Sequence, residues 1–291
     1  MFATFHGNVV PIQSASQNAN EIILAMPYFA RGSLADRISN APVTPKEWVR
    51  IALGILNGVS QIHTAGYIHF DLKPSNIMFN DTDDPMVADF GQARCVLPGG
   101  RVVVPRMYYR AMPPETLSAR IGSMLGDIYQ VGLLLYRAIN GDPVYQAQFV
   151  GIDDAAMRQR VIAGRLPDRK LFLPHVPKSI RRIIRKALKL DPAQRYQSAQ
   201  DFAKTVARVD PRLNWVTTIH ASGEMSWKAE RPGKSDLEVD LLGAPGGKWN
   251  VRAWTVNGTS KRATGSMVLS RSGLDEDEAM DHLNDVFVQL A

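Results

Sequence analysis

Two short stretches, HFDLKPSNI (residues 69–77) and ADFG (residues 88–91), carry most of the information in this chain of 291 residues. The first stretch holds an acid, a lysine and an amide, and the second holds another acid. These side chains are Asp71, Lys73, Asn76 and Asp89. A shared site explains the combined set better than surface charges on an unrelated fold do.

The interval between the two stretches predicts how they meet. Short strands are predicted at residues 77–79 and 86–88, on either side of the turn residues 80–85. A two-stranded hairpin returns the chain to the point where it started. We therefore expect the hairpin to bring Asp71 and Asp89 close together.

The two stretches resemble the catalytic loop and the metal-binding loop of eukaryotic-type Ser/Thr protein kinases. The resemblance covers roughly residues 5–209, with the motifs in the order of that family. It implies that Asp71 accepts the proton of the substrate hydroxyl and that Lys73 stabilises the transferring phosphoryl group. Asn76 and Asp89 would hold Mg²⁺, which prefers oxygen ligands. ATP and Mg²⁺ are the implied cofactors, and a protein Ser or Thr is the implied substrate.

The segment MPYF (residues 26–29) resembles the gatekeeper and hinge of the family. The resemblance implies that the backbone C=O of Pro27 and the N–H of Phe29 pair with adenine. Proline lacks an N–H, but this position does not need a donor. The nucleotide-binding residues implied by the resemblance are Met26, Pro27, Phe29 and Met78.

Further residues resemble those that support the family's fold. His69 matches a core position that packs on Phe90. Asp127 resembles the helix-start aspartate that accepts hydrogen bonds from the catalytic-loop backbone. Glu115 resembles the end of the activation segment, and Arg195 resembles its buried partner, because a desolvated carboxylate needs such a pairing.

One departure from the family's pattern lies inside the catalytic loop. Phe70 stands where the family usually has an arginine that pairs with a phosphorylated activation loop. A phenylalanine cannot make that ion pair. We therefore expect activity that does not depend on activation-loop phosphorylation through this contact.

A larger departure lies at the front of the chain. Nothing before residue 5 could supply the glycine-rich loop, the strand lysine or the helix glutamate that position ATP. Three explanations stay open. A partner chain supplies the N-lobe function; or the chain is a weak or inactive pseudokinase that acts as a nucleotide-binding regulatory or scaffold module; or the C-terminal segment supplies the missing half, as in a circular permutant.

The permutant explanation rests on three residues and one loop. The segment LGAPGGKWNV (residues 242–251) loosely resembles a phosphate-covering loop, and Lys261 precedes Glu276 and Glu278 by a family-like interval. These three side chains are the speculative ATP-positioning residues. Against this, such glycines are typical of hairpin turns, and Lys261 is predicted in a turn. The alternative is an independent accessory module.

The predicted fold class is α+β, in three parts. Residues 1–30 form a two-strand remnant of the N-lobe with the hinge, with strands predicted at 9–12 and 22–26. Residues 31–210 form a mainly helical protein-kinase-like C-lobe. Residues 211–291 form a small α+β accessory domain of about five strands and one helix.

Periodicity and turn residues predict the individual elements. Long helices are predicted at 45–64, 127–139, 178–190 and 276–290, and a short one begins near residue 33. The strands predicted in the C-terminal part lie at 215–219, 225–229, 237–241, 249–254 and 267–269.

Composition limits the kinds of partner and the cellular compartment that we expect for this protein. The net charge of +6 is mild, so a nucleic-acid partner is not expected. A single cysteine, Cys95, excludes an internal disulfide framework. The chain shows no signal peptide and no apolar run long enough to cross a bilayer. We therefore expect a cytoplasmic protein with no membrane partner.

Overall fold

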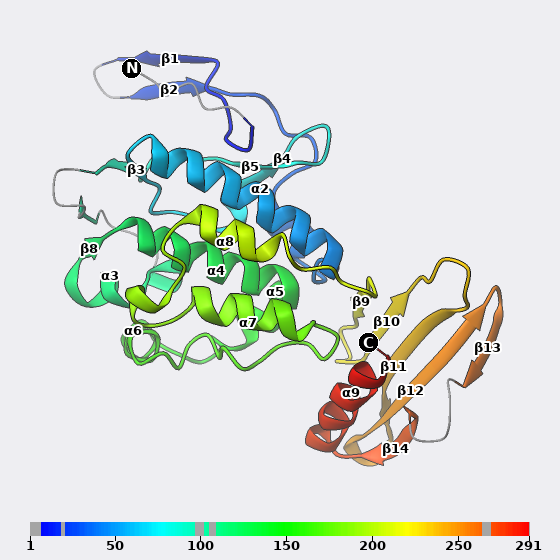
Figure 1. The fold of residues 1–291 in the computed structure, drawn as a ribbon. Helices are drawn as coiled ribbons and strands as arrows, with labels where there is room; N and C mark the ends of the chain where they lie inside the picture. Colours follow the sequence, from blue (N-terminus) through cyan, green and yellow to red (C-terminus); the bar gives the residue numbers. More distant parts are fainter. Residues whose placement is uncertain (1–6, 19–20, 97–101, 105–108, 264–268, 291) are drawn as a thin grey trace.

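The computed structural model describes residues 7–18, 21–96, 102–104, 109–263 and 269–290. A two-stranded hairpin lies at one end of the molecule, a helical part forms the middle, and a sheet covered by one helix lies at the other end (Figure 1). Helices and sheets are thus combined in one chain, as the predicted α+β class requires. The residue limits predicted for the three parts stay a prediction.

The N-terminal hairpin consists of β1 (Ser14–Gln17) and β2 (Ile22–Ala25), paired antiparallel. The first predicted strand, at residues 9–12, was therefore wrong, and the polar stretch that follows it forms the strand instead. Val9 and Val10 are buried against the helical part, where the N–H of Val10 donates to the C=O of Val87 over 2.9 Å. Val9 and Val10 are apolar because they are buried in tertiary contacts and not because they form a strand. β1 is exposed at every position, so a polar sequence can form it.

The helical part begins with α1 (Leu34–Ile38) and α2 (Pro45–Thr64). The hydroxyl of Thr44 accepts a hydrogen bond from the N–H of Glu47, and proline occupies the first turn, so both start signals of α2 are present. The predicted apolar face of α2 is buried and forms the centre of the core. Its members are Trp48, Ile51, Ala52, Ile55, Leu56, Val59 and Ile62.

The remaining helices complete this core. α4 is almost wholly buried, which agrees with its mostly apolar sequence. The helices are α3 (Pro114–Ala119), α4 (Met124–Asn140), α5 (Asp142–Ala147), α6 (Asp154–Ile162), α7 (Lys178–Ala187) and α8 (Ala199–Val206). Two short strand pairs lie beside them. These are β3 (Tyr67–Ile68) with β6 (Arg94–Cys95), and β7 (Val102–Val103) with β8 (Ile121–Gly122).

The hairpin between the two motif stretches forms nearly as predicted. β4 (Ile77–Phe79) pairs antiparallel with β5 (Pro85–Val87), so that Ile77 lies opposite Val87. The second strand ends one residue earlier than predicted.

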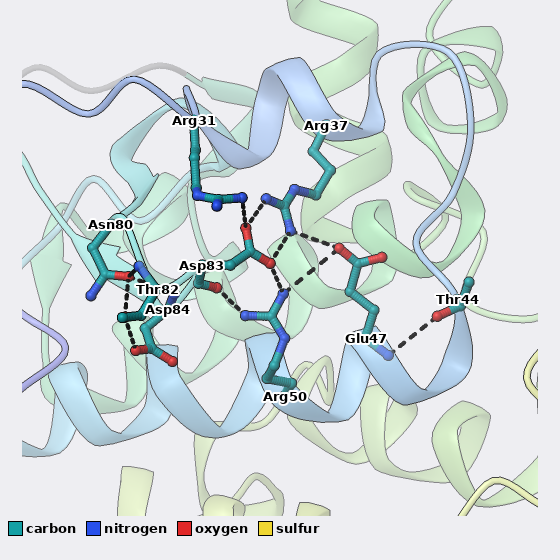
Figure 2. Close-up of polar contacts among 9 residues, drawn as sticks. All are labelled: Arg31, Arg37, Thr44, Glu47, Arg50, Asn80, Thr82, Asp83 and Asp84. Atoms are coloured by element: carbon teal, nitrogen blue, oxygen red, sulfur yellow. Dashed lines mark hydrogen bonds and ion pairs between the residues drawn. The ribbon is translucent and has the colours of Figure 1, made fainter.

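Three arginines hold the tip of this hairpin, as Figure 2 shows. Asp83, which has a left-handed backbone (φ 65°), forms ion pairs with Arg37 and Arg50 and a longer one of 3.8 Å with Arg31. Arg37 also reaches Glu47 over 2.7 Å. The hydrogen bond from Arg37 is the main cause that lowers the pKa of the Asp83 carboxyl. The network fastens the hairpin to α1 and α2.

The C-terminal part is a six-stranded sheet covered on one face by α9 (Glu276–Leu290). The strand order is β13-β12-β11-β10-β9, and β14 also pairs with β12. The strands are β9 (Val216–Ile219), β10 (Met225–Ala229), β11 (Asp236–Ala244), β12 (Lys248–Asn257), β13 (Ser260–Ala263) and β14 (Arg271–Leu274). Trp227, Val239 and Leu283 lie at the centre of a core that is distinct from that of the helical part.

This sheet differs from the prediction of about five strands. β13 and β14 were missed, because the first is exposed at every position and so shows no alternation, and the second contains Gly273 at φ 73°. The predicted strand at 267–269 lies partly outside the described residues. Among the described helices, none is both long and apolar enough to cross a membrane.

Candidate active site

The catalytic-loop stretch brings three predicted residues into direct contact. Asp71 is buried, and its Oδ2 accepts hydrogen bonds from Lys73 Nζ over 2.6 Å and from Asn76 Nδ2 over 3.0 Å. The Asn76 amide also donates to the C=O of Asp71 over 2.8 Å. The loop therefore holds one carboxylate between a cation and an amide.

The second stretch lies directly beside the first. The N–H of Ala88 donates to the C=O of Asn76 over 2.9 Å, and His69 Nε2 donates to the C=O of Ala88 over 3.1 Å. Asp89 follows at once, exposed and with a left-handed backbone (φ 64°), and its Oδ1 accepts from the N–H of Gly91. Both acids of the motif lie close enough to His69 to act on its charge.

Burial lowers the pKa of His69, although the nearby carboxylates of Asp127, Asp71 and Asp89 oppose that shift. The neutral ring donates from Nε2 and accepts from the N–H of Asp71 at Nδ1 over 3.3 Å. Its ring centroid lies 5.2 Å from that of Phe90. His69 therefore connects the two stretches from inside the core.

Asp127 on α4 accepts hydrogen bonds from the backbone of the catalytic loop. Its carboxylate accepts hydrogen bonds from the N–H groups of His69 and Phe70, over 2.8 and 3.0 Å, and from His63 Nε2 over 2.8 Å. These bonds support Phe70 in its left-handed conformation (φ 66°). The contacts agree with the supporting role that the resemblance implied for Asp127.

Two residues of this scaffold were missed from the sequence. Gln130 accepts from the N–H of Leu72 and donates to the C=O groups of Phe70 and Ala111. His63 lies in the last turn of α2, where its ring contacts Asp127. Gln130 follows Asp127 by three residues on a helix, so the two share one face, and that spacing could have identified it.

A buried ion pair connects distant parts of the helical core. Both guanidinium Nη atoms of Arg195 lie 2.7 Å from the carboxylate oxygens of Glu115. Arg195 is fully buried and also donates to the C=O groups of Leu125, Lys189 and Leu190. The structure thus brings together the pair implied by the resemblance.

The residues implied for nucleotide binding are only partly brought together. Phe29 and Met78 pack against a small buried cluster of Val10, Met86 and Ala88. Pro27 is half-buried. Met26 is 57% exposed and has no place in that cluster.

Phe70 packs on Gly122 at the end of β8. Its ring lies so close to Gly122 that an added Cβ there would come within 2.0 Å of Phe70 Cε1, and Val104 lines the same place. Phe70 is 4% exposed. An apolar contact therefore occupies the position where the family usually places an arginine.

The speculative ATP-positioning set was wrong. Lys261 lies in β13, not in a turn, and forms an ion pair with Glu238. Glu278 instead accepts from the N–H of Asp275 over 3.0 Å and, like Glu276, lies in the first turn of α9, where the helix dipole favours acids.

The predicted phosphate-covering loop is a hairpin turn. Gly246 and Gly247 have positive φ between β11 and β12, and Gly243 is paired with Trp249. Turn geometry alone accounts for these glycines.

The donor set suits magnesium better than a transition metal. Among the described residues, no group of three or more His, Cys, Asp or Glu side chains could hold a metal ion. Asn76 and Asp89 would instead offer one amide oxygen and one carboxylate. Mg²⁺ is usually held in this way, by one or two protein ligands with water and substrate phosphates completing the shell.

Comparison with known proteins agrees with this geometry. The protein kinase domain family matches residues 1–206. The chain is 28% identical over 230 residues to serine/threonine-protein kinase PrkC of Bacillus subtilis, covering 76% of this chain and 34% of that protein. It is 32% identical over 199 residues to calcium-dependent protein kinase 25 of Arabidopsis thaliana, covering 66% and 37%.

A mouse protein is similar over a longer stretch. Serine/threonine-protein kinase ULK3 of Mus musculus is 29% identical over 248 residues, covering 82% of this chain and 49% of that protein. The chain spans about a third to a half of the length of these curated relatives. Because the family match covers well over half of its residues, this chain belongs to the protein kinase family.

Proposed function

We propose that the protein is a serine/threonine kinase that transfers the γ-phosphoryl group of ATP to a Ser or Thr hydroxyl of a protein. The observation that carries this proposal is the joint position of Asp71, Lys73 and Asn76, with Asp89 beside them. Phosphoryl transfer depends on positioning and on charge stabilisation, and these four groups supply both.

Each residue has a separate task in this proposal. Asp71 orients the attacking hydroxyl and accepts its proton. Lys73, which already contacts the Asp71 carboxylate, places its positive charge beside the transferring group. Asn76 and Asp89 hold Mg²⁺, which neutralises charge on the β- and γ-phosphates when bound. Phe29 and Met78 supply apolar surface for the adenine ring.

The contact of Phe70 with Gly122 supports a site that needs no phosphate beside residue 70. A buried aromatic ring replaces the cation that a phosphate would require. We infer that the loop is ordered by packing and by Asp127. Mapping of phosphorylated residues in the active protein tests this, and an obligatory phosphate docked beside Phe70 would contradict it.

The β1–β2 hairpin supports a role for further N-lobe strands. Ile23 and Leu24 are 56% and 47% exposed on β2, and among the described residues no third strand pairs with the hairpin. We propose that a partner chain, or the rest of a longer protein, covers this hairpin and positions ATP. The cytoplasmic location stays a prediction.

The test combines binding and transfer. Mg–ATP binding is measured first, and then γ-phosphate transfer to a generic basic protein, with Asp71→Ala and Asp89→Ala as variants. Asp81→Ala, an exposed acid in the β4–β5 turn, is the matched control. Transfer that disappears in both site variants and persists in the control supports the enzyme. Binding without transfer, even with candidate partner chains added, supports a nucleotide-binding scaffold instead.

A further inference from the structure

A cavity of about 640 Å³ lies between the helical part and the C-terminal sheet domain. One wall comes from the segment before α7 and the start of that helix, and the other comes from residues 210–215, just before β9, and from α9. Trp215, Phe287 and Val176 are buried apolar residues that line it. We name this the interdomain cavity. It has no residue in common with the candidate active site.

A buried histidine fixes the two walls relative to each other. Trp227 Nε1 donates to His175 Nδ1 over 2.9 Å, and His175 Nε2 donates to Thr217 Oγ1 over 3.3 Å. The Phe287 ring lies 6.1 Å from the imidazole. Every hydrogen-bonding atom of the neutral ring is therefore used between the two parts. The cavity beside it is bounded by fixed walls.

The residues that line the interdomain cavity carry more positive than negative charge. Lys178, Arg181 and Arg212 line the cavity, with Asp210 as the one acid among its lining residues. None of the three cations forms an ion pair within the described ranges of the chain. Arg181 is held in place because it donates to the C=O groups of Val176 and Pro174.

The start of α7 adds to this positive character. Lys178 is the first residue of α7, the first turn holds no acid, and no side chain caps the helix. The first N–H groups of α7 therefore have no side-chain cap, and the positive end of the helix dipole lies at Lys178. Lys178 and Arg212 form no ion pair among the described residues and lie on the wall of an apolar space, so they match an anionic group joined to an apolar body.

We propose that the interdomain cavity binds a small amphipathic organic anion. Its apolar body packs on Trp215 and Phe287, and its carboxylate, sulfonate or phosphate group lies at Lys178 and Arg212. The volume falls within the roughly 300–1,000 Å³ that is usual for small-molecule sites, which often form between domains. Since both parts contribute a wall, the ligand also stabilises their docked arrangement.

Anilinonaphthalene sulfonate tests the proposal on the full chain, because it joins an aromatic body to one negative charge. Its neutral analogue, phenylnaphthylamine, isolates the contribution of that charge. Saturating Mg–ATP is present throughout, so that a nucleotide site cannot take up the probe. We expect saturable binding of the sulfonate at one site, and binding of the neutral analogue at least about tenfold weaker.

Two variants locate the probe. Lys178→Glu with Arg212→Glu reverses the charge of the wall and should weaken sulfonate binding at least about tenfold, with no effect on the neutral analogue. The control, Lys234→Glu with Lys248→Glu, makes the same change of net charge at exposed residues outside the cavity. Val288→Trp fills the space at an exposed lining residue, leaves every charge in place and should weaken both probes.

Circular dichroism confirms that each variant is folded before binding is measured. The proposal is overturned by non-saturable binding, by equal affinity for the charged and neutral probes, or by equal losses in the charge-reversal variant and its control. It is also overturned if Val288→Trp leaves both affinities unchanged. Phosphoryl transfer is a separate readout, so failure here leaves the kinase proposal untouched.

Discussion

Two buried histidines, one in the catalytic loop and one between the two parts of the molecule, lie in opposite electrostatic surroundings. Burial lowers the pKa of both. Around His69 the charged neighbours are the carboxylates of Asp127, Asp71 and Asp89, which oppose the effect of burial. Beside His175 the charged neighbour is the guanidinium of Arg181, which adds to it.

Because the charges around the two histidines have opposite signs, the two regions suit ligands of opposite charge. The catalytic loop collects carboxylates around a neutral imidazole, and such surroundings attract cations such as Mg²⁺ and Lys73. The interdomain contact places one cation, Arg181, beside a neutral imidazole, and such surroundings attract anions.

The largest effect is expected at Asp89. Asp89→Cys replaces the proposed oxygen ligand by a thiolate, so transfer with Mg²⁺ should fall by more than about a hundredfold. Replacing Mg²⁺ by Cd²⁺, which thiolates prefer, should restore part of the activity. Asp81→Cys places the same thiol in the β4–β5 turn and should behave like the wild type with both metals. Equal loss with both metals in Asp89→Cys would argue against a metal ligand.

Removal of one partner from the buried ion pair should cost the most stability. Glu115→Gln leaves the guanidinium of the fully buried Arg195 without its anion. We expect a loss of about 2–3 kcal/mol in the free energy of unfolding, measured in denaturant, since Glu115 is itself partly exposed to water. Asp201→Asn breaks the exposed pair with Lys204 and should cost less than about 0.5 kcal/mol.

His175 makes stability depend on pH. Burial lowers its pKa from 6.5 to about 3 in the folded protein. Between these two values the unfolded chain binds one proton more, so the stabilisation is complete above pH 6.5 and is lost as the pH falls toward about 3. We expect a loss of about 1 kcal/mol between pH 6.5 and about pH 5.5 from this residue.

The variant His175→Gln isolates that contribution. Its amide oxygen can still accept from Trp227, but it does not titrate. The difference between wild-type and variant unfolding free energies should therefore shrink as the pH falls, while contributions from His69 cancel. A constant difference over this range would contradict a neutral, buried His175.

The smallest effect is expected at the tip of the β4–β5 hairpin. Asp83→Asn removes the charge that Arg37 and Arg50 share, and should cost about 1 kcal/mol, since these side chains are partly exposed. The loss should shrink in high salt. Asp81→Asn, in the same turn without an ion pair, should leave stability unchanged. Equal stability of the two variants would show that the arginine network contributes nothing measurable.

The helical part was largely predictable because its signals are local. α2 begins and ends at the residues predicted from the apolar period. α9 likewise begins and ends as predicted. The hairpin between the two motif stretches was predictable because its strands and turn lie within one short segment.

Elements whose partners lie far away in the sequence were missed. Val9 and Val10 looked like a strand but are buried against residue 87. His63 and Gln130 meet the catalytic loop through tertiary contacts, and His175 meets Trp227 across 52 residues. Lys261 on β13 forms its ion pair with Glu238 on β11 across the strand between them, β12. No local pattern carries that information.

The variant Asp71→Asn tests the central claim most directly. It keeps the shape of the side chain and one oxygen that can accept from Lys73 or Asn76, but removes the negative charge and, with it, the capacity to accept a proton. We predict that Mg–ATP affinity stays within about twofold of wild type while γ-phosphate transfer falls by about a hundredfold or more. Unchanged transfer would show that the carboxylate held between Lys73 and Asn76 is not the catalytic base.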